Sequence, residues 1–267
     1  MPVPIYFRQS GSGPDMIILH GLFGSSDNWH SISKKLETHF RIFLPDLRNH
    51  GQSPHTDTHS YEDMTADLEL FFQTNRLDKT IVMGHSMGGK LAMMFAAKHP
   101  EKIKHLIVAD ITPKQYTSDS SEDEDQEMLL TLMETLDFSL ISTRKEIDEA
   151  LSKKIRSISL RQFLIKNIYR NKEGKFGWKI NVPVLRKYLP AIIHDVNENF
   201  FNDYKPITSY PVTFIRGLNS NYIQDKDLSL IKSIYPQSKI IDIPNAGHWL
   251  HAEQPEKFIN AVLSSLL

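Results

Sequence analysis

Short apolar runs, each followed by a turn signal and then an amphipathic stretch, recur along this chain. They are rich in Ile, Val, Leu and Phe without clean polar–apolar alternation, as is typical of strands buried on both faces. The six runs are MIILHG, FRIFLPD, TIVMGHS, HLIVADI, VTFIRG and KIIDIPNAG. Amphipathic segments such as NWHSISKKLETH and KLAMMFAAKH lie between them. This alternation predicts right-handed βαβ units, and therefore an α/β fold around a mostly parallel sheet.

The alternation stops after Ile111 and resumes at Tyr210. The intervening stretch has helical spacing, as in EMLLTLMETLDFSLI and KEIDEALSKKI, and no clear strand. We therefore expect a core made of residues 1–111 and 206–267, with a mainly helical lid at residues 112–205. The acidic run Ser118–Glu127 has too few apolar groups to offset the cost of ordering, so it predicts a solvated or mobile surface loop.

Composition excludes several classes of protein. The net charge is −1, with no dense Lys/Arg stripe, so no overall field selects nucleic acid as a partner. No stretch approaches the roughly 18 apolar residues of a membrane span, and the N-terminus lacks the pattern of a signal peptide. The absence of cysteine excludes disulfides and thiol catalysis and is compatible with a reducing compartment. We expect a cytoplasmic protein that acts on a small molecule, with its oligomeric state left open.

The motif G-x-S-x-G occupies Gly84–Gly88, after the strand run TIVM and before a helical pattern. A sharp strand–turn–helix places the Ser86 hydroxyl at the tip of the turn, and glycines on either side tolerate the strained backbone. The following helix N-terminus directs N–H groups toward a group above the serine. Ser86 is therefore the predicted nucleophile, although a structural glycine turn would have the same residues.

A second element, LHGLFGS, follows the strand run MIIL. In this arrangement a backbone N–H after His-Gly pairs with the N–H of the residue after the nucleophile, and the two hold an oxyanion. The predicted donors are Leu22 and Met87, with Phe23 as the neighbouring possibility. The alternative is that His-Gly merely ends a strand.

A serine nucleophile needs a general base, and histidine has a suitable pKa near neutrality. His248 lies in the loop NAGHWLHAEQPE after the last strand run, at the end of the chain order Ser…Asp…His. His251 is the nearest competitor, and we interpret it as the start of the final helix.

The orienting acid is the least obvious member of the site. The usual position follows VTFIRG, where the sequence has only Asn219, Ser220 and Asn221. Asp110 ends the neighbouring run LIVADI, and an acid need only reach Nδ1 of the histidine. Asp110 is therefore the predicted acid. The alternatives are that Asp110 caps its loop with Thr112, or that Asp225 is the acid.

Two further patterns bear on cofactors and on the pocket surroundings. The sequence contains no HEXXH motif, no metal-ligand set, no Walker loop and no G-x-G-x-x-G motif, so we expect no cofactor. The polar segment PDLRNHGQSPH, at Pro45–His55, is interpreted as a loop bonded to itself rather than as part of the chemistry.

Six segments taken together resemble the α/β-hydrolase superfamily, and within it the YbfF-like subgroup of bacterial esterases: HGLFGSSDNW, DLRNHGQSPH, GHSMGGK, ADITP, KFGWKINVPVL and AGHWLHAEQPE. The insert from Lys114 to about Leu160 matches weakly. The resemblance implies an eight-stranded sheet, with a helical lid after the sixth strand. It also implies an aspartate 24 residues after the nucleophile, the position of Asp110, with the loop Asn219–Asn221 helping to orient His248.

The resemblance implies hydrolysis of acyl esters or thioesters through an acyl-enzyme on Ser86. The lid would then form the acyl pocket. Candidate substrate-binding walls are Phe23 and Met87 from the core, with Phe138, Phe163, Trp178 and Leu185 from the lid. Two other functions stay open, since fold does not fix function. One is a lyase or C–C hydrolase similar to the synthase of menaquinone biosynthesis, and the other is a non-catalytic small-ligand receptor.

Overall fold

A seven-stranded sheet organises the computed structural model, which describes residues 1–116 and 121–266, with side chains at all of these except 121–125. The strand order is β1-β3-β2-β4-β5-β8-β9. The strands are β1 (Phe7–Ser10), β2 (Asp15–Leu19), β3 (Arg41–Pro45), β4 (Thr80–His85), β5 (Ile103–Ala109), β8 (Val212–Gly217) and β9 (Lys239–Ile243). β1 pairs antiparallel with β3, and the other neighbours are parallel. The predicted mostly parallel α/β fold is confirmed.

The strand count implied by the resemblance is wrong for the described part of the chain. The sheet has seven strands rather than eight, and the insert follows the fifth strand, β5. Residues 1–6, which lie before β1, are not strand. Pro2 and Pro4 lack the N–H that a strand ladder uses, and Val3 N–H donates to Asp67 Oδ1 at 2.6 Å instead.

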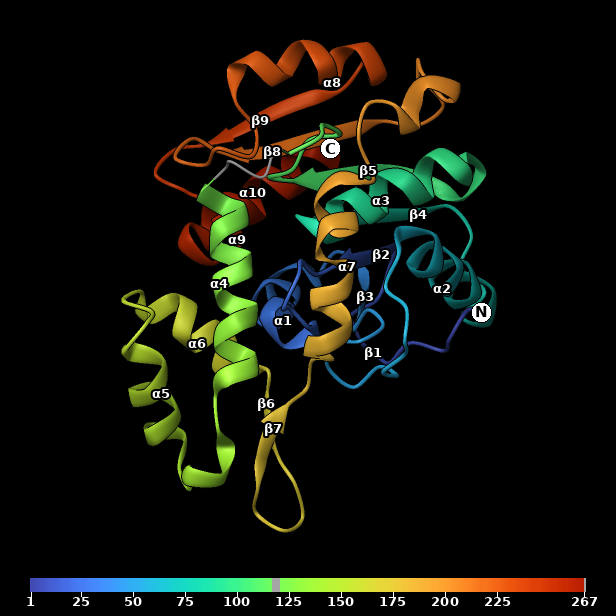
Figure 1. Ribbon diagram of the computed structural model, residues 1–267. Coiled ribbons are helices and arrows are strands. Elements are labelled where there is room, and N and C mark those ends of the chain that lie inside the picture. The colour runs from blue at the N-terminus through green and yellow to red at the C-terminus, as the bar shows by residue number, and fades with distance from the viewer. Residues whose placement is uncertain (117–120, 267) are drawn as a thin grey trace.

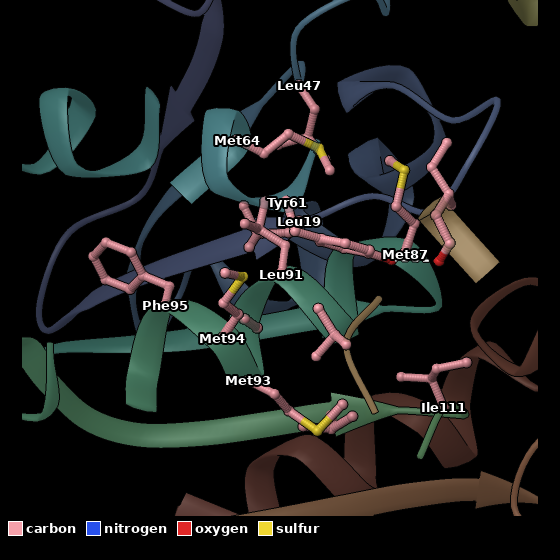
Figure 2. Packing of buried hydrophobic residues seen from close by; sticks show 14 of the residues in the cluster. Leu19, Leu47, Tyr61, Met64, Met87, Leu91, Met93, Met94, Phe95 and Ile111 are labelled. Carbon is pink, nitrogen blue, oxygen red and sulfur yellow. Dashed lines mark hydrogen bonds between the residues drawn. The ribbon is translucent and has the colours of Figure 1, made fainter. Parts of the chain in front are cut away.

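Helices cover both faces of the sheet, because the strands between its two edges bury side chains on both sides. One apolar cluster joins the sheet to α2, α3 and α8, and Figure 2 shows Met64 of α2 and Leu91 of α3 in it. A second cluster joins the opposite face to α1 and α10. The core helices are α1 (Ser26–Leu36), α2 (Tyr61–Thr74), α3 (Met87–Lys98), α8 (Leu228–Ile234), α9 (Leu250–Glu253) and α10 (Pro255–Leu266). Short 3₁₀ helices occupy Pro100–Lys102, Phe138–Leu140, Phe200–Asp203 and Asp225–Asp227.

The chain between β5 and β8 is mainly helical, as the spacing predicted, but it also contains a hairpin. Its elements are α4 (Ser121–Thr135), α5 (Arg144–Ser152), α6 (Ile158–Lys166), β6 (Ile168–Arg170), β7 (Phe176–Trp178) and α7 (Val182–His194). Figure 1 shows the β6–β7 hairpin projecting away from the main sheet. Its strands have three residues each, too few to show a period in the sequence. Across the described ranges, no helix is long and apolar enough to cross a membrane.

The acidic run was predicted to be a loop, and this is wrong where the structure describes it. Residues 118–120 lie outside the described residues, but the chain from Ser121 onward forms α4. Acidic residues are favourable in the first turns of a helix, because they lie near the positive end of its dipole. Farther along α4, Glu127 forms an ion pair with Arg186 of α7. Helical charge preference and tertiary pairing therefore outweigh the low apolar content.

Helix α7 is attached to the core at both of its ends. At its start, Asn181 N–H donates to Asn49 O at 3.0 Å. Near its end, the Tyr61 hydroxyl donates to Ile192 O at 2.9 Å, and the Lys90 ammonium donates to Ile193 O. Tyr61 and Lys90 belong to the core helices α2 and α3. These bonds fix α7 as a wall over the carboxyl ends of the central strands.

Candidate active site

The turn between β4 and α3 presents Ser86 in a strained backbone conformation, with φ 54° and ψ −122°. Only glycine fits on either side of it. A Cβ on Gly84 would lie 2.1 Å from Gly88 O, and one on Gly88 would lie 2.5 Å from Leu19 O. Ser86 N–H donates to Ala109 O at 3.2 Å, which joins the turn to β5. A non-glycine residue held at positive φ by such packing is common at functional sites.

The fold brings together Asp110 and His248, which are 138 residues apart in the sequence. His248 Nδ1 lies 2.8 Å from Asp110 Oδ2, and the carboxylate side chain is fully buried while the imidazole is 18% exposed. Gly217 N–H donates to Asp110 Oδ1 at 3.1 Å, and the Ser220 hydroxyl donates to Oδ2. A histidine that donates through Nδ1 presents Nε2 as an acceptor. The pair therefore has the geometry of a base and its orienting acid.

The polar loop after β8 hydrogen-bonds to the Asp110 carboxylate rather than to His248. Ser220 bonds the Asp110 carboxylate, whereas the resemblance implied that the loop orients His248. Asn219 N–H donates to Ala246 O at 2.8 Å, which joins this loop to the one that bears His248. The alternative acid, Asp225, has a side chain 88% exposed and pairs with Arg216 at 2.7 Å. The loop after β8 thus supplies a hydroxyl to an acid that comes from β5.

The alternative role for Asp110, as a cap for its own loop, is filled by another residue. Thr112 N–H and the Thr112 hydroxyl both lie 3.0 Å from the Tyr116 hydroxyl. Asp110 itself has a positive φ of 50°, which turns its carboxylate toward β8 and His248. The strain at Asp110 is therefore associated with the histidine contact.

The loop after β2 passes directly over Ser86. A Cβ on Gly21 would lie 3.2 Å from Ser86 Cβ, so the backbone at Gly21 and Leu22 borders the serine. Phe23 has φ 59°, and its N–H donates to His50 Nε2 at 3.3 Å. The Phe23 N–H is therefore already used as a donor to a core side chain. Of the two neighbouring candidates, Leu22 is therefore the better placed as an oxyanion donor.

Two more histidines lie beside His248, and in the described part of the chain neither is hydrogen-bonded to Asp110. His85 Nε2–H donates to His248 O at 2.7 Å and so fixes the backbone at His248. His251 lies in α9 and stacks on Trp29, with ring centroids 4.3 Å apart. Burial lowers the pKa of His251 to about 3, which keeps it neutral. His251 is thus a buried partner of Trp29, and His248 is the histidine that meets the acid.

In the described part of the chain, Ser86 borders one cavity of about 180 Å³ and another of about 30 Å³. Of the predicted wall residues, Phe23 and Phe163 line the larger cavity and Met87 lines the smaller. Trp178 and Leu185, both predicted to bind substrate, line neither of these two. Trp178 instead donates from Nε1 to Met133 O at 2.9 Å, and Leu185 is fully buried in the apolar core.

Several cavity residues were missed in the sequence. The largest omission is Tyr222, which stacks on His248 and lines both cavities. The larger cavity is also lined by Leu129, Leu160, Trp249 and His251. Trp249 and His251 immediately follow the predicted base, so their closeness to it was the available signal.

The segment Pro45–His55 was predicted to be bonded to itself, and it is bonded both to itself and to the core. Asp46 accepts N–H bonds from Ser26 at 2.6 Å and Gln52 at 2.8 Å. Arg48 is buried and pairs with Asp67 through Nε at 2.6 Å. These charged groups are therefore paired within the scaffold behind the Gly21–Phe23 loop.

Comparison with known proteins agrees with this architecture. The family described as alpha/beta hydrolase fold matches residues 14–255. The chain is 35% identical over 259 residues to the mouse (Mus musculus) sn-1-specific diacylglycerol lipase ABHD11, covering 95% of this chain and 81% of the relative. It is 30% identical over 255 residues to esterase YbfF of Escherichia coli K12, covering 96% and 93%.

A solved structure of a marine microorganism esterase superposes with a TM-score of 0.92 at 43% identity, covering 98% of this chain and 99% of that one. The nucleophile turn, the histidine–acid pair and these similarities lead to one assignment. The chain belongs to the alpha/beta hydrolase fold family and is a hydrolase of the esterase and lipase type.

Proposed function

We propose that this protein is a serine hydrolase that cleaves carboxylic esters or acyl thioesters through an acyl-enzyme on Ser86. The observation that supports this most is the 2.8 Å contact between His248 Nδ1 and the buried Asp110 carboxylate. A buried acid on Nδ1 fixes the tautomer in which Nε2 accepts a proton from a serine hydroxyl. Ser86 and His248 line the same cavity, where such a transfer would occur.

In the first half-reaction, Ser86 Oγ attacks the acyl carbonyl carbon while His248 Nε2 takes the hydroxyl proton. The backbone N–H groups of Leu22 and Met87 stabilise the oxyanion. When the tetrahedral intermediate collapses, His248 returns that proton to the leaving oxygen or sulfur, and the alcohol or thiol departs. In the second half-reaction, His248 deprotonates water, which attacks the acyl-enzyme. When that intermediate collapses, His248 returns the proton to Ser86 Oγ, and the carboxylic acid departs.

We propose that residues 112–205 act as a lid over a core of residues 1–111 and 206–267. Leu129 of α4, together with Leu160 and Phe163 of α6, lines the larger cavity beside Ser86. These walls come from the insert, so the insert would shield the acyl-enzyme from bulk water.

The test is pre-steady-state hydrolysis of p-nitrophenyl acetate, with mass spectrometry of the quenched enzyme. We expect a burst of nitrophenol and a mass increase of one acetyl group on the peptide that contains Ser86. Ser86→Ala, with its fold checked by circular dichroism, should show neither. Nitrophenol release without an adduct, and unchanged in Ser86→Ala, would contradict the acyl-enzyme, and binding without turnover would support the receptor. An adduct on a peptide that lacks Ser86 would contradict the proposed nucleophile.

A further inference from the structure

The two cavities beside Ser86 have different relationships to the proposed catalytic groups. Leu22, Ser86, Gln126 and Tyr222 line both. Within the described part of the chain, His248 is a wall of the larger cavity alone, whereas Met87 is a wall of the smaller cavity alone. The proposed base, His248, therefore borders the larger cavity, and one proposed oxyanion donor, Met87, borders the smaller one.

This asymmetry decides where each half of an ester can lie. The tetrahedral carbon formed on Ser86 bears an oxyanion, a leaving group and the acyl chain. The oxyanion must face the N–H donors, and the leaving oxygen must come within hydrogen-bond reach of His248 Nε2 to receive its proton. Because His248 borders the larger cavity, the leaving group occupies that cavity. The acyl chain is left to point past Met87 into the smaller one.

Resting on the proposed function, we infer that the smaller cavity is the acyl subsite and the larger cavity is the leaving-group subsite. Under this assignment the lid borders both subsites: α7 contributes walls to the acyl subsite, and α4 and α6 contribute walls to the leaving-group subsite. The smaller cavity, of about 30 Å³, has far less room than the larger one, of about 180 Å³. It therefore suits a short acyl group rather than a long chain. The substrate class is a short-chain acyl ester of a bulky apolar alcohol or thiol.

The walls of the larger cavity agree with a bulky apolar leaving group. Trp29, Phe163 and Trp249 contribute aromatic rings, and the rings of Phe163 and Trp249 meet edge-on with centroids 4.0 Å apart. Leu129 and Leu160 add aliphatic surface. Such walls bind apolar groups by burying them, with little demand for particular hydrogen bonds.

The walls of the smaller cavity limit chain length. Met87, Ile111, Ile192 and Ile193 supply apolar surface, and both isoleucines at 192 and 193 belong to α7. The carbonyl oxygens of Ile192 and Ile193 accept bonds from the core side chains of Tyr61 and Lys90. The far wall of this cavity is thus attached to the core, so a longer chain would meet a fixed surface.

The experiment varies each half of the ester separately. The first series holds the alcohol constant as p-nitrophenol and uses acetate, propionate, butyrate and octanoate. The second holds the acyl group constant as acetate and uses ethyl, butyl and octyl esters, whose leaving groups have similar acidity. We expect kcat/KM to fall at least about tenfold from propionate to octanoate, and to hold or rise from ethyl to octyl acetate.

Two matched variants test which cavity controls the acyl preference and which controls the alcohol preference. Ile193→Ala removes a wall of the smaller cavity and leaves the Ile193 carbonyl in place, and Leu160→Ala removes a wall of the larger one. Ile193→Ala should raise the butyrate-to-acetate ratio of kcat/KM about tenfold, with the alcohol series unchanged. Leu160→Ala should alter the alcohol series alone, and thermal melts confirm that both variants fold.

Three outcomes would overturn the assignment. A wild-type preference for octanoate over acetate would place the acyl chain in the larger cavity, with the proposed esterase function intact. A change in acyl preference caused by Leu160→Ala, and not by Ile193→Ala, would do the same. If wild type hydrolyses no ester in either series, the proposed function fails together with this inference.

Discussion

The ring of Tyr222 stacks on the imidazole of His248, with centroids 3.7 Å apart and planes inclined by 18°. Tyr222 N–H donates to the Ser220 oxygen at 3.2 Å, and the Ser220 hydroxyl donates to Asp110. One short segment therefore supports both the proposed base and its acid. Tyr222 holds the ring of the histidine by contact, and Ser220 holds the acid by a hydrogen bond.

Replacing Tyr222 should reveal the contribution of this stack. Such ring pairs contribute about 1 kcal/mol, so Tyr222→Leu should lower kcat for p-nitrophenyl acetate roughly fivefold. Tyr222→Phe keeps the ring and should stay near wild type. If Phe and Leu lower kcat equally, the hydroxyl, which accepts from Gln126 Nε2 at 3.3 Å, would be the functional part instead.

The acid should be identified by variants of the two candidate acids, Asp110 and Asp225, and of Ser220, which donates to Asp110. Asp110→Asn should lower kcat by roughly 10⁴-fold, because an amide can hold the imidazole in the wrong tautomer. Ser220→Ala removes one of the donors to that carboxylate and should lower kcat roughly tenfold. Asp225→Asn, on an exposed side chain paired with Arg216, should match wild type. Equal rates for Asp110→Asn and wild type would make Asp110 a structural residue.

His50 should act as a positioning residue for the proposed oxyanion loop. Its Nε2 accepts the Phe23 N–H at 3.3 Å, and its Nδ1–H donates to Arg48 O at 3.0 Å. His50→Ala removes the acceptor and should lower kcat roughly tenfold with little change in KM, since an oxyanion donor acts mainly in the transition state. His59→Ala removes a neighbouring buried ring, 5.3 Å from His50, as the control. Equal losses of kcat in both variants would indicate a packing effect only.

Stability should fall as the pH drops below about 6.5, and His105 is one identifiable cause. Burial, and then the nearby charge of Lys239, lower its pKa to about 4 in the folded state, against 6.5 in the unfolded chain. Between these values the unfolded state binds the extra proton, so stability rises with pH in that window and is lost on acidification. At pH 5 the loss from this histidine amounts to about 2 kcal/mol.

The measurement is urea denaturation at pH 7.5 and pH 5, for wild type and His105→Gln. Glutamine preserves a polar partner for the Thr213 hydroxyl, which lies 3.0 Å from His105 Nε2. The variant should lose about 2 kcal/mol less than wild type between the two pH values. Identical losses would exclude His105. Further pH dependence should remain in the variant, because burial also lowers the pKa of His59 and His251 to about 3.

The core could be predicted from the sequence because its signals are local. A buried strand, a glycine-flanked serine and a helix follow one another within a few residues around Ser86, and each constrains the next. Asp110 and His248 were identifiable because each directly follows or closely follows a strand run on the same sheet edge. Parallel topology then brings such positions together.

The pocket walls could not be predicted in the same way, because they depend on how the insert packs. Trp178 was a reasonable aromatic candidate, yet it ends β7 and bonds Met133 of α4, a partner that no sequence spacing indicates. Leu185 has the burial expected of an apolar helix face, but that face meets the core rather than a cavity. Tyr222 was missed because it lies in an irregular loop without periodicity, and its contact with His248 exists only in the folded chain.

The attachment of α7 at both ends has a consequence for how substrate range could diversify. Its bonds to Asn49, Tyr61 and Lys90 hold the α7 wall in place, so this wall limits the size of one half of an ester substrate. The walls from α4 and α6 border the other half. Under the inferred subsites, laboratory evolution should broaden the range of accepted alcohols by changes in α4 and α6. Acceptance of longer acids should instead require changes at α7 or the core residues that hold it.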